Sequence, residues 1–188
     1  MSSPAASTVT FGALLRRFRR NRRGSAVVQF ALVAPMFFAL LFAILETALM
    51  FFASQVLETI AQNSARTILT GQAQTGQLVA CSNAPCTQGT FQTYVCSQIP
   101  ALFNCNNIYV DVESFSVFSN ITFPTQIDAN GNFINNMQYN PGSASQITVV
   151  RLYYAWPIFV TGLGYNITNM ANSQRLLMAS AAFQNEPY

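Results

Sequence analysis

The chain has 188 residues, of which 51% are hydrophobic and only 8% are charged. Soluble domains carry about 25% charged residues, so this composition indicates one membrane segment together with one domain of modest size. The net charge of +3 does not belong to that domain, because only three of the nine arginines but all six acidic residues follow Gly24. A strongly basic, nucleic-acid-binding domain is therefore not expected.

Residues 1–24 form a basic leader. Its six arginines are Arg16, Arg17, Arg19, Arg20, Arg22 and Arg23. An arginine cluster can bind nucleic acid, but this one directly precedes a long apolar stretch, which favours retention on the cytoplasmic side of a membrane. We therefore expect a cytoplasmic leader and no nucleic-acid partner.

The apolar stretch runs from Ala26 to Ala53, and only Gln29 and Glu46 interrupt it strongly. A helix needs about 20 residues to cross the hydrocarbon core of a bilayer, and residues 26–48 supply them. The apolar core of a secretory signal is shorter, so the stretch predicts a permanent single-pass transmembrane helix.

The helical pattern continues beyond the predicted span. Apolar residues recur at three- and four-residue spacing between Val56 and Leu69, and Gly71 follows. The sequence therefore predicts one helix over 25–70, about 68 Å long at 1.5 Å per residue. Its second half is amphipathic and needs a globular partner to cover the apolar stripe.

Glu46 lies after about 21 helical residues, close to the expected outer interface of the bilayer. A charge at the bilayer centre costs about 2.5–3.5 kcal/mol, so the depth of this carboxylate decides its role. Two interpretations are open. The carboxylate is solvated by headgroup water, or it contacts a partner helix.

The four cysteines, Cys81, Cys86, Cys96 and Cys105, all follow the predicted span. An even number of cysteines outside the cytoplasm indicates disulfides, and three pairings are possible. We favour Cys81–Cys86 with Cys96–Cys105, because each pair closes a short loop. A zinc site is the alternative, but the chain has no histidine and the cysteine spacings lack the usual paired short loops. No metal is therefore expected.

Residues 71–188 are expected to form a disulfide-bonded α+β domain, in which a small antiparallel sheet covers the apolar stripe of the long helix. In chain order the patterns predict a loop over 72–89, a short helix near 90–99, a strand from Ile108, a long connection over 119–145 with a turn at 128–132, and strands near 146–155 and 175–184. The aromatic residues Tyr153, Tyr154, Trp156 and Phe159 are expected in the core and on the sheet.

The first strand carries two further expectations. Its apolar positions change parity between Val112 and Phe115, which predicts a bulge near Glu113-Ser114. Asp111 and Glu113 lie two residues apart and are expected on the solvated outer face. Without histidine and without a nucleophile or phosphate-loop motif, no enzymatic activity and no cofactor are expected.

The boundary at Gly24-Ser25 resembles the class III signal of type IV pilin-like proteins, in which a basic leader ends in Gly and a hydrophobic helix follows. The stretch from Arg23 to Pro35 looks like the N-terminus of TadE-like proteins in particular. Three later stretches are similar to that family as well: Cys96 to Val112, Val149 to Pro157 and Asn185 to Tyr188.

This resemblance implies a pilin-like α+β protein of the bacterial inner membrane, with its N-terminus in the cytoplasm and its domain in the periplasm. It also implies cleavage between Gly24 and Ser25 by a prepilin peptidase, and contacts with other pilin-like subunits and pilus assembly proteins. Gln29 departs from the pattern, because the family usually has Glu at the fifth mature position. Gln29 is either a tolerated polar residue near the cytoplasmic interface or a sign that the chain is no ordinary filament subunit.

Two functional classes follow. In the first, the chain is a minor pilin or pseudopilin that takes part in assembly of a Tad/Flp pilus and so supports surface adhesion and biofilm growth. In the second, it is a single-pass anchored envelope protein whose exported domain binds a partner unrelated to pili. A weaker third interpretation is a secreted soluble domain, which a mature N-terminus beyond Ala53 would indicate.

Overall fold

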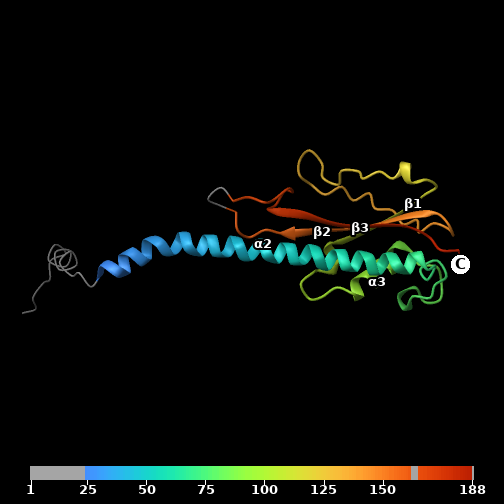
Figure 1. Ribbon diagram of the computed structural model, residues 1–188, viewed down its shortest axis with the longest axis horizontal. Helices are drawn as coiled ribbons and strands as arrows, with labels where there is room; N and C mark the ends of the chain where they lie inside the picture. Colours follow the sequence, from blue (N-terminus) through green and yellow to red (C-terminus); the bar gives the residue numbers. More distant parts are fainter. Residues whose placement is uncertain (1–23, 162–164, 188) are drawn as a thin grey trace, which may run out of the picture. The chain divides into compact units, whose positions relative to one another are not determined.

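The computed structural model describes residues 24–161 and 165–187. The chain divides into two compact units, with the boundary between Ile44 and Leu45. Helix α2, Ser25–Leu69, belongs to both units, and all other elements of regular structure described here belong to the second. These elements are a long helix and a small antiparallel sheet, which confirms the expected α+β class (Figure 1).

Helix α2 spans 45 residues, as the continuous helical pattern predicts. The chain turns away just after Leu69, where Gly71 adopts φ +74° and donates its N–H to the Ile68 carbonyl at 3.0 Å. Glycine reaches this left-handed conformation without the steric cost of a Cβ, which makes it the usual residue at the C-terminal end of a helix.

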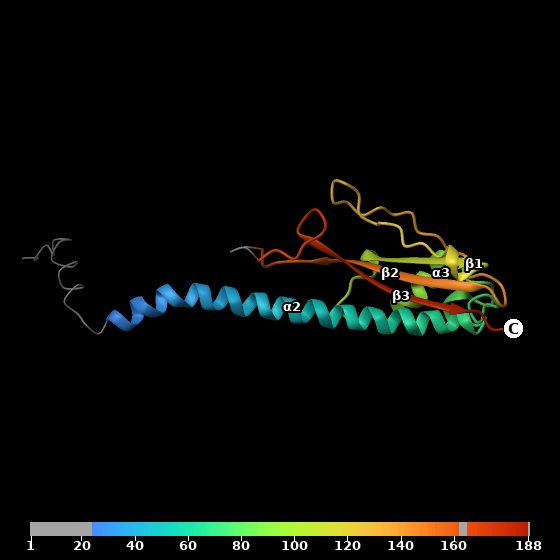
Figure 2. The same cartoon turned by 45° about the horizontal axis from the view of Figure 1, so that its top comes forward.

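The second half of α2 buries one stripe in the core of the second unit. Figures 1 and 2 both show the strands lying beside this half of the helix. Its buried residues are Met50, Ala53, Leu57, Ile60, Ala61, Ser64, Ala65, Thr67 and Ile68. They recur at three- and four-residue intervals, so the amphipathic pattern and the need for a covering partner are confirmed.

The sheet has three strands in the order β1-β2-β3: β1 is Ile108–Phe115, β2 is Ile147–Pro157 and β3 is Gln174–Gln184. Both pairs are antiparallel. Val110, Val112, Leu152 and Leu177 lie on the face toward α2, in the same core cluster as its buried stripe. Burial of this apolar surface is the main favourable contribution to the fold.

The predicted bulge in β1 is wrong. All eight residues of β1 oppose residues of β2 one to one, from the Ile108–Tyr154 pair to the Phe115–Ile147 pair. The change of parity at Phe115 has another cause, because the second face of the sheet is covered as well. The connection between β1 and β2 lies over that face, opposite α2 (Figures 1 and 2). A half-buried aromatic residue such as Phe115 is therefore stable there.

The second face also corrects the expectation for Asp111. This residue is only 2% exposed, whereas Glu113 is partly exposed. Both carboxylates contact Arg151, which is fully buried: the distances from its guanidinium are 2.6 Å to Asp111 and 3.2 Å to Glu113. An alternating strand pattern does not reveal that a long loop will cover the polar face.

The covering connection is fastened to this charged cluster. The Arg151 guanidinium also donates to the Thr122 carbonyl at 2.6 Å and lies 5.2 Å from the centre of the Phe123 ring. The second carboxylate oxygen of Asp111 accepts the Gln138 N–H at 2.8 Å. Burial by itself would lower the pKa of Arg151, but the hydrogen bonds and charges of its two carboxylate partners outweigh it and raise that pKa.

A short helix, α3, Gln88–Ser97, packs Phe91 and Val95 into the same core. It begins two residues before the predicted start because Thr87 forms a capping box with Thr90. The turn predicted at 128–132 is present, with the Asp128 carboxylate accepting N–H groups from Asn130 and Asn132. These hydrogen bonds lower the pKa of Asp128, first among them that of the Asn132 N–H.

Two backbone hydrogen bonds hold the chain around the C-terminal end of α2. The Glu186 N–H donates to the Leu69 carbonyl at 3.0 Å, so the segment after β3 satisfies a carbonyl at the C-terminal end of α2. The Cys86 N–H donates to the Ala73 carbonyl at 2.8 Å and holds the loop that follows the helix.

The charged cluster gives a first prediction. The substitution Arg151→Met leaves Asp111 buried without a cation, so the free energy of unfolding should fall by about 3–5 kcal/mol. The measurement is chemical denaturation of the purified full chain in detergent. Arg66→Met removes the same charge from an exposed position and should change the free energy by no more than about 0.5 kcal/mol. Equal losses for the two variants would contradict the structural role of Arg151.

Candidate functional site on the apolar helix

The predicted processing site lies at the first described residues. Helix α2 begins at Ser25, and a Cβ placed on Gly24 would meet no atom within 4 Å. Among the described residues, none apart from its chain neighbours therefore lies beside the Cα of Gly24. The arginine cluster at 16–23 lies outside the described residues, and cleavage between Gly24 and Ser25 stays a prediction.

Gln29 lies on the exposed surface of the first turns of α2. Its side-chain amide donates to the Ser25 hydroxyl at 3.5 Å, which is the outer limit of a hydrogen bond. This contact joins residues four apart on the same helix, a spacing that brings side chains together. Gln29 thus has a local partner and carries no charge.

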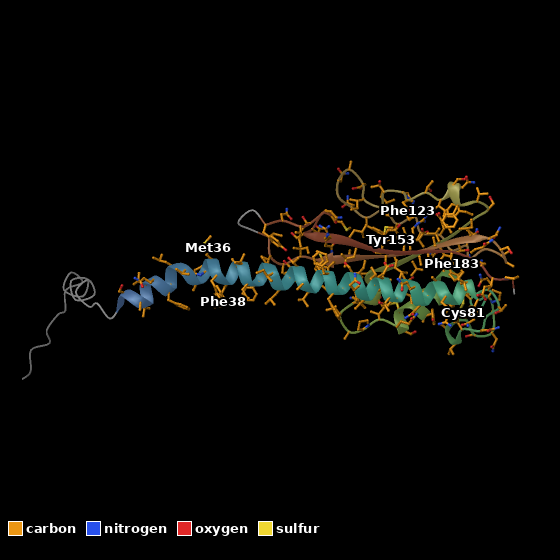
Figure 3. The ribbon with its side chains drawn as sticks, in the orientation of Figure 1. Met36, Phe38, Cys81, Phe123, Tyr153 and Phe183 are labelled. Carbon is orange, nitrogen blue, oxygen red and sulfur yellow. A yellow bond between two sulfur atoms is a disulfide. The ribbon has the colours of Figure 1, made fainter. Side chains whose placement is uncertain are left out.

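The N-terminal half of α2 is long and apolar enough to cross a membrane. None of the residues in its most apolar window is buried in the structure. Figure 3 shows Met36 and Phe38 projecting from different sides of the helix, and they are 76% and 45% exposed. A helix that is apolar on all sides and uncovered matches the surface expected of a lipid-facing span.

Glu46 has partners within its own chain, and the two interpretations of its place in a bilayer stay predictions. The side chain is buried at 7% exposure, and its carboxylate binds the chain's own backbone. One oxygen accepts the Phe159 N–H at 2.5 Å, and the other accepts the Val160 N–H at 3.0 Å. The two amides belong to the segment directly after β2, so Glu46 fastens this segment to α2.

The neighbouring residue on the helix makes a parallel contact. The Thr47 hydroxyl hydrogen-bonds the Tyr165 hydroxyl, and Ile158 is buried in the core at 5% exposure. The segment after β2 is therefore held on α2 by Glu46 and Thr47 together. Hydrogen bonds that a carboxylate accepts from N–H groups are about twice as strong as those between neutral groups. They offset the cost of placing this carboxylate on an apolar helix.

The expectation for the aromatic residues holds for three of the four. Tyr153, Tyr154 and Trp156 are buried, but Phe159 is 83% exposed. Its position follows from Glu46, because the carboxylate binds the backbone of Phe159 and leaves the ring outside the core. Sequence reasoning missed this site because its donors are main-chain N–H groups, which no side-chain pattern reports.

The cysteines lie in two pairs at disulfide distance, Cys81 with Cys86 and Cys96 with Cys105. These are the pairs that close the short loops. Within 24–161 and 165–187, no group of three or more His, Cys, Asp or Glu side chains is placed to hold a metal ion. An open depression of about 280 Å³ is lined by Glu113, Ser114, Phe115, Gln138 and Asn140, and its one charged group already contacts Arg151.

The contact made by Glu46 gives a second prediction. The substitution Glu46→Ala removes the acceptors of two N–H groups, each such bond to a charged group being worth about 1.5–3 kcal/mol. Amide hydrogen exchange at Phe159 and Val160 should therefore become at least about tenfold faster. Glu46→Gln retains one carbonyl acceptor, so its exchange rates should lie between those of the wild type and Glu46→Ala.

Glu58→Ala is the control, because it removes another carboxylate from the same helix. It should leave the exchange rates of these two amides unchanged, and faster exchange in that variant would contradict the role assigned to Glu46.

Comparisons with known proteins bear on the same helix. No curated protein and no solved structure matches the chain. Residues 24–66 match the family model described as TadE-like protein. The match begins at Gly24 and includes Gln29 and Glu46, and it ends before the stretches Cys96 to Val112, Val149 to Pro157 and Asn185 to Tyr188. The segment over 24–66, which holds nearly all of helix α2, is thus similar to TadE-like proteins.

Proposed function

We propose that the protein is a minor pilin or pseudopilin that takes part in assembly of a Tad/Flp pilus, and that it has no enzymatic role. The observation that carries this proposal is the TadE-like match over residues 24–66, which coincides with an uncovered apolar helix. A pilin-like machine joins its subunits through such helices, which pack beside one another in the membrane.

The proposed location is the bacterial inner membrane, with residues 1–24 in the cytoplasm and the α+β domain in the periplasm. The arginine-rich leader supports this orientation, since basic residues are retained on the cytoplasmic side. The two cysteine pairs support it too, because disulfides persist in an oxidising compartment. The proposed partners are other pilin-like subunits, pilus assembly proteins and a prepilin peptidase.

Gln29 supports a minor rather than a major role. In filaments of pilin-like proteins, the Glu that usually occupies this position pairs with the free N-terminal amine of a neighbouring subunit. An uncharged amide offers that amine a hydrogen bond but leaves its charge uncompensated, and an unpaired charge in hydrocarbon is costly. We therefore propose that the protein acts during assembly more than as the repeating subunit of the filament. Adhesion and biofilm growth would follow from the pilus that it helps to build.

The same residue favours the second candidate function, an anchored envelope protein unrelated to pili. In that case α2 serves only as an anchor, and the exported domain binds another envelope component. The state of the Gly24-Ser25 bond separates the two candidates, because only the pilus protein has to pass through a prepilin peptidase.

Cleavage is the third prediction. Co-expressed with an active prepilin peptidase, the membrane-extracted protein should have the intact mass of residues 25–188; with an inactive peptidase it should retain residues 1–24. Gly24→Val should block the cut, because it places a branched side chain where the class III signal has Gly, at a position with space for that side chain. Gly89→Val is the matched control, since a Cβ there also meets no atom within 4 Å. A start at Met1 beside the active peptidase would favour the unrelated envelope protein, and a start beyond Ala53 a secreted domain.

The orientation is the fourth prediction. Val79 is 98% exposed, so Val79→Cys places a reactive thiol on the surface of the domain. A membrane-impermeant maleimide should label it fully in spheroplasts, with no gain after the membrane is permeabilised. Ala6→Cys in the leader, tested without an active prepilin peptidase so that the leader is retained, should react only after permeabilisation. The opposite pattern would overturn the proposed topology.

A further inference from the structure

The segment after β2 lies at a defined position along α2. Its residues Phe159 and Val160 are bonded to Glu46, and Tyr165 is bonded to Thr47. These contacts involve adjacent helix residues within the second compact unit. Wherever that turn of the helix lies, the segment lies beside it.

The rise of the helix fixes the depth of that turn in a bilayer. Glu46 follows Ser25 by 21 residues, which is about 31 Å at 1.5 Å per residue. The hydrocarbon core is about 30 Å thick. If the arginine-flanked start of α2 lies at one surface of this core, Glu46 lies at the other, where hydrocarbon gives way to headgroups.

The segment presents one large apolar side chain to the outside. Phe159 is 83% exposed although its neighbour Ile158 is buried, and the exposed ring is adjacent to the bonded backbone of Val160. Residues 157–161, the described part of the chain directly around it, include no charged side chain. The helix beside it is equally apolar outside the core, since Leu49 and Phe52 are 51% and 58% exposed.

We propose that the Phe159 side chain is a second membrane contact, inserted into the boundary between acyl chains and headgroups of the outer leaflet. Aromatic side chains favour this zone, and apolar residues inserted there bind in proportion to the area that they bury. Glu46 positions the contact by binding the backbone, which leaves the ring free to enter the lipid. The domain is then attached to the bilayer at α2 and again at Phe159.

We assign the Phe159 surface to lipid rather than to a second subunit, because the position of Glu46 along α2 sets the depth of Phe159 within a single chain. A bilayer that covers the predicted span, residues 26–48, ends near Glu46, whether or not a neighbouring helix is present. The inference rests on the membrane-spanning role proposed for α2, and it does not depend on the pilus.

The test uses the full chain in nanodiscs with one copy per disc. Phe159→Cys is labelled with an environment-sensitive fluorophore under non-reducing conditions, and phospholipids carry a nitroxide either near the headgroup or deep in the acyl chain. We expect blue-shifted emission and quenching by the shallow nitroxide about threefold stronger than at Val79→Cys, an exposed apolar site beyond the C-terminal end of α2. Adding Glu46→Gln should reduce the quenching at position 159.

Phe38→Cys reports separately on the membrane span. If the deep nitroxide fails to quench a label at position 38, the proposed anchor itself is wrong. If position 38 is quenched and position 159 is no more quenched than position 79, the anchor stands and the second contact is overturned. A third outcome would also overturn the proposal. If the emission at position 159 shifts to the blue only with two copies per disc, and neither nitroxide lipid quenches it, the surface binds a second subunit.

Discussion

One helix has to satisfy two different environments, and the rest of the structure follows from that constraint. Along its N-terminal half α2 leaves every side uncovered, as suits a hydrocarbon solvent. Between Val56 and Leu69 only one stripe is apolar, and water on the other sides makes burial of that stripe favourable. The three-stranded sheet and α3 supply the cover, so the domain is built on the part of the helix beyond the span.

Glu46 is a polar group between the uncovered part of α2 and the part that the sheet covers. It interrupts the apolar stretch that runs from Ala26 to Ala53, and its side chain is buried. The backbone amides of Phe159 and Val160 take the place of water around its carboxylate. A carboxylate in this position selects one arrangement of the segment after β2, since any other would leave it buried without a donor.

Most of the fold could be predicted from the sequence because most of it depends on apolar periodicity. The stripe from Leu57 to Ile68 has helical spacing, and the alternation from Ile108 to Val112 has strand spacing. The second face of the sheet could not be predicted, because the covering loop depends on one buried cation, Arg151, and its contacts with distant residues. The Glu46 site was inaccessible for a related reason, since its partners are peptide groups present at every position. The cysteine pairing followed from loop length alone.

The bond from Glu186 to the carbonyl of Leu69 has a consequence for folding. The carbonyl that it satisfies lies at the C-terminal end of α2, whereas the donor follows β3. Among the described strands β3 pairs with β2 alone, so the sheet closes through contacts between residues far apart in sequence. Such contacts form late, because long loops must close first. The end of α2 therefore keeps an unsatisfied carbonyl until the segment after β3 has reached it.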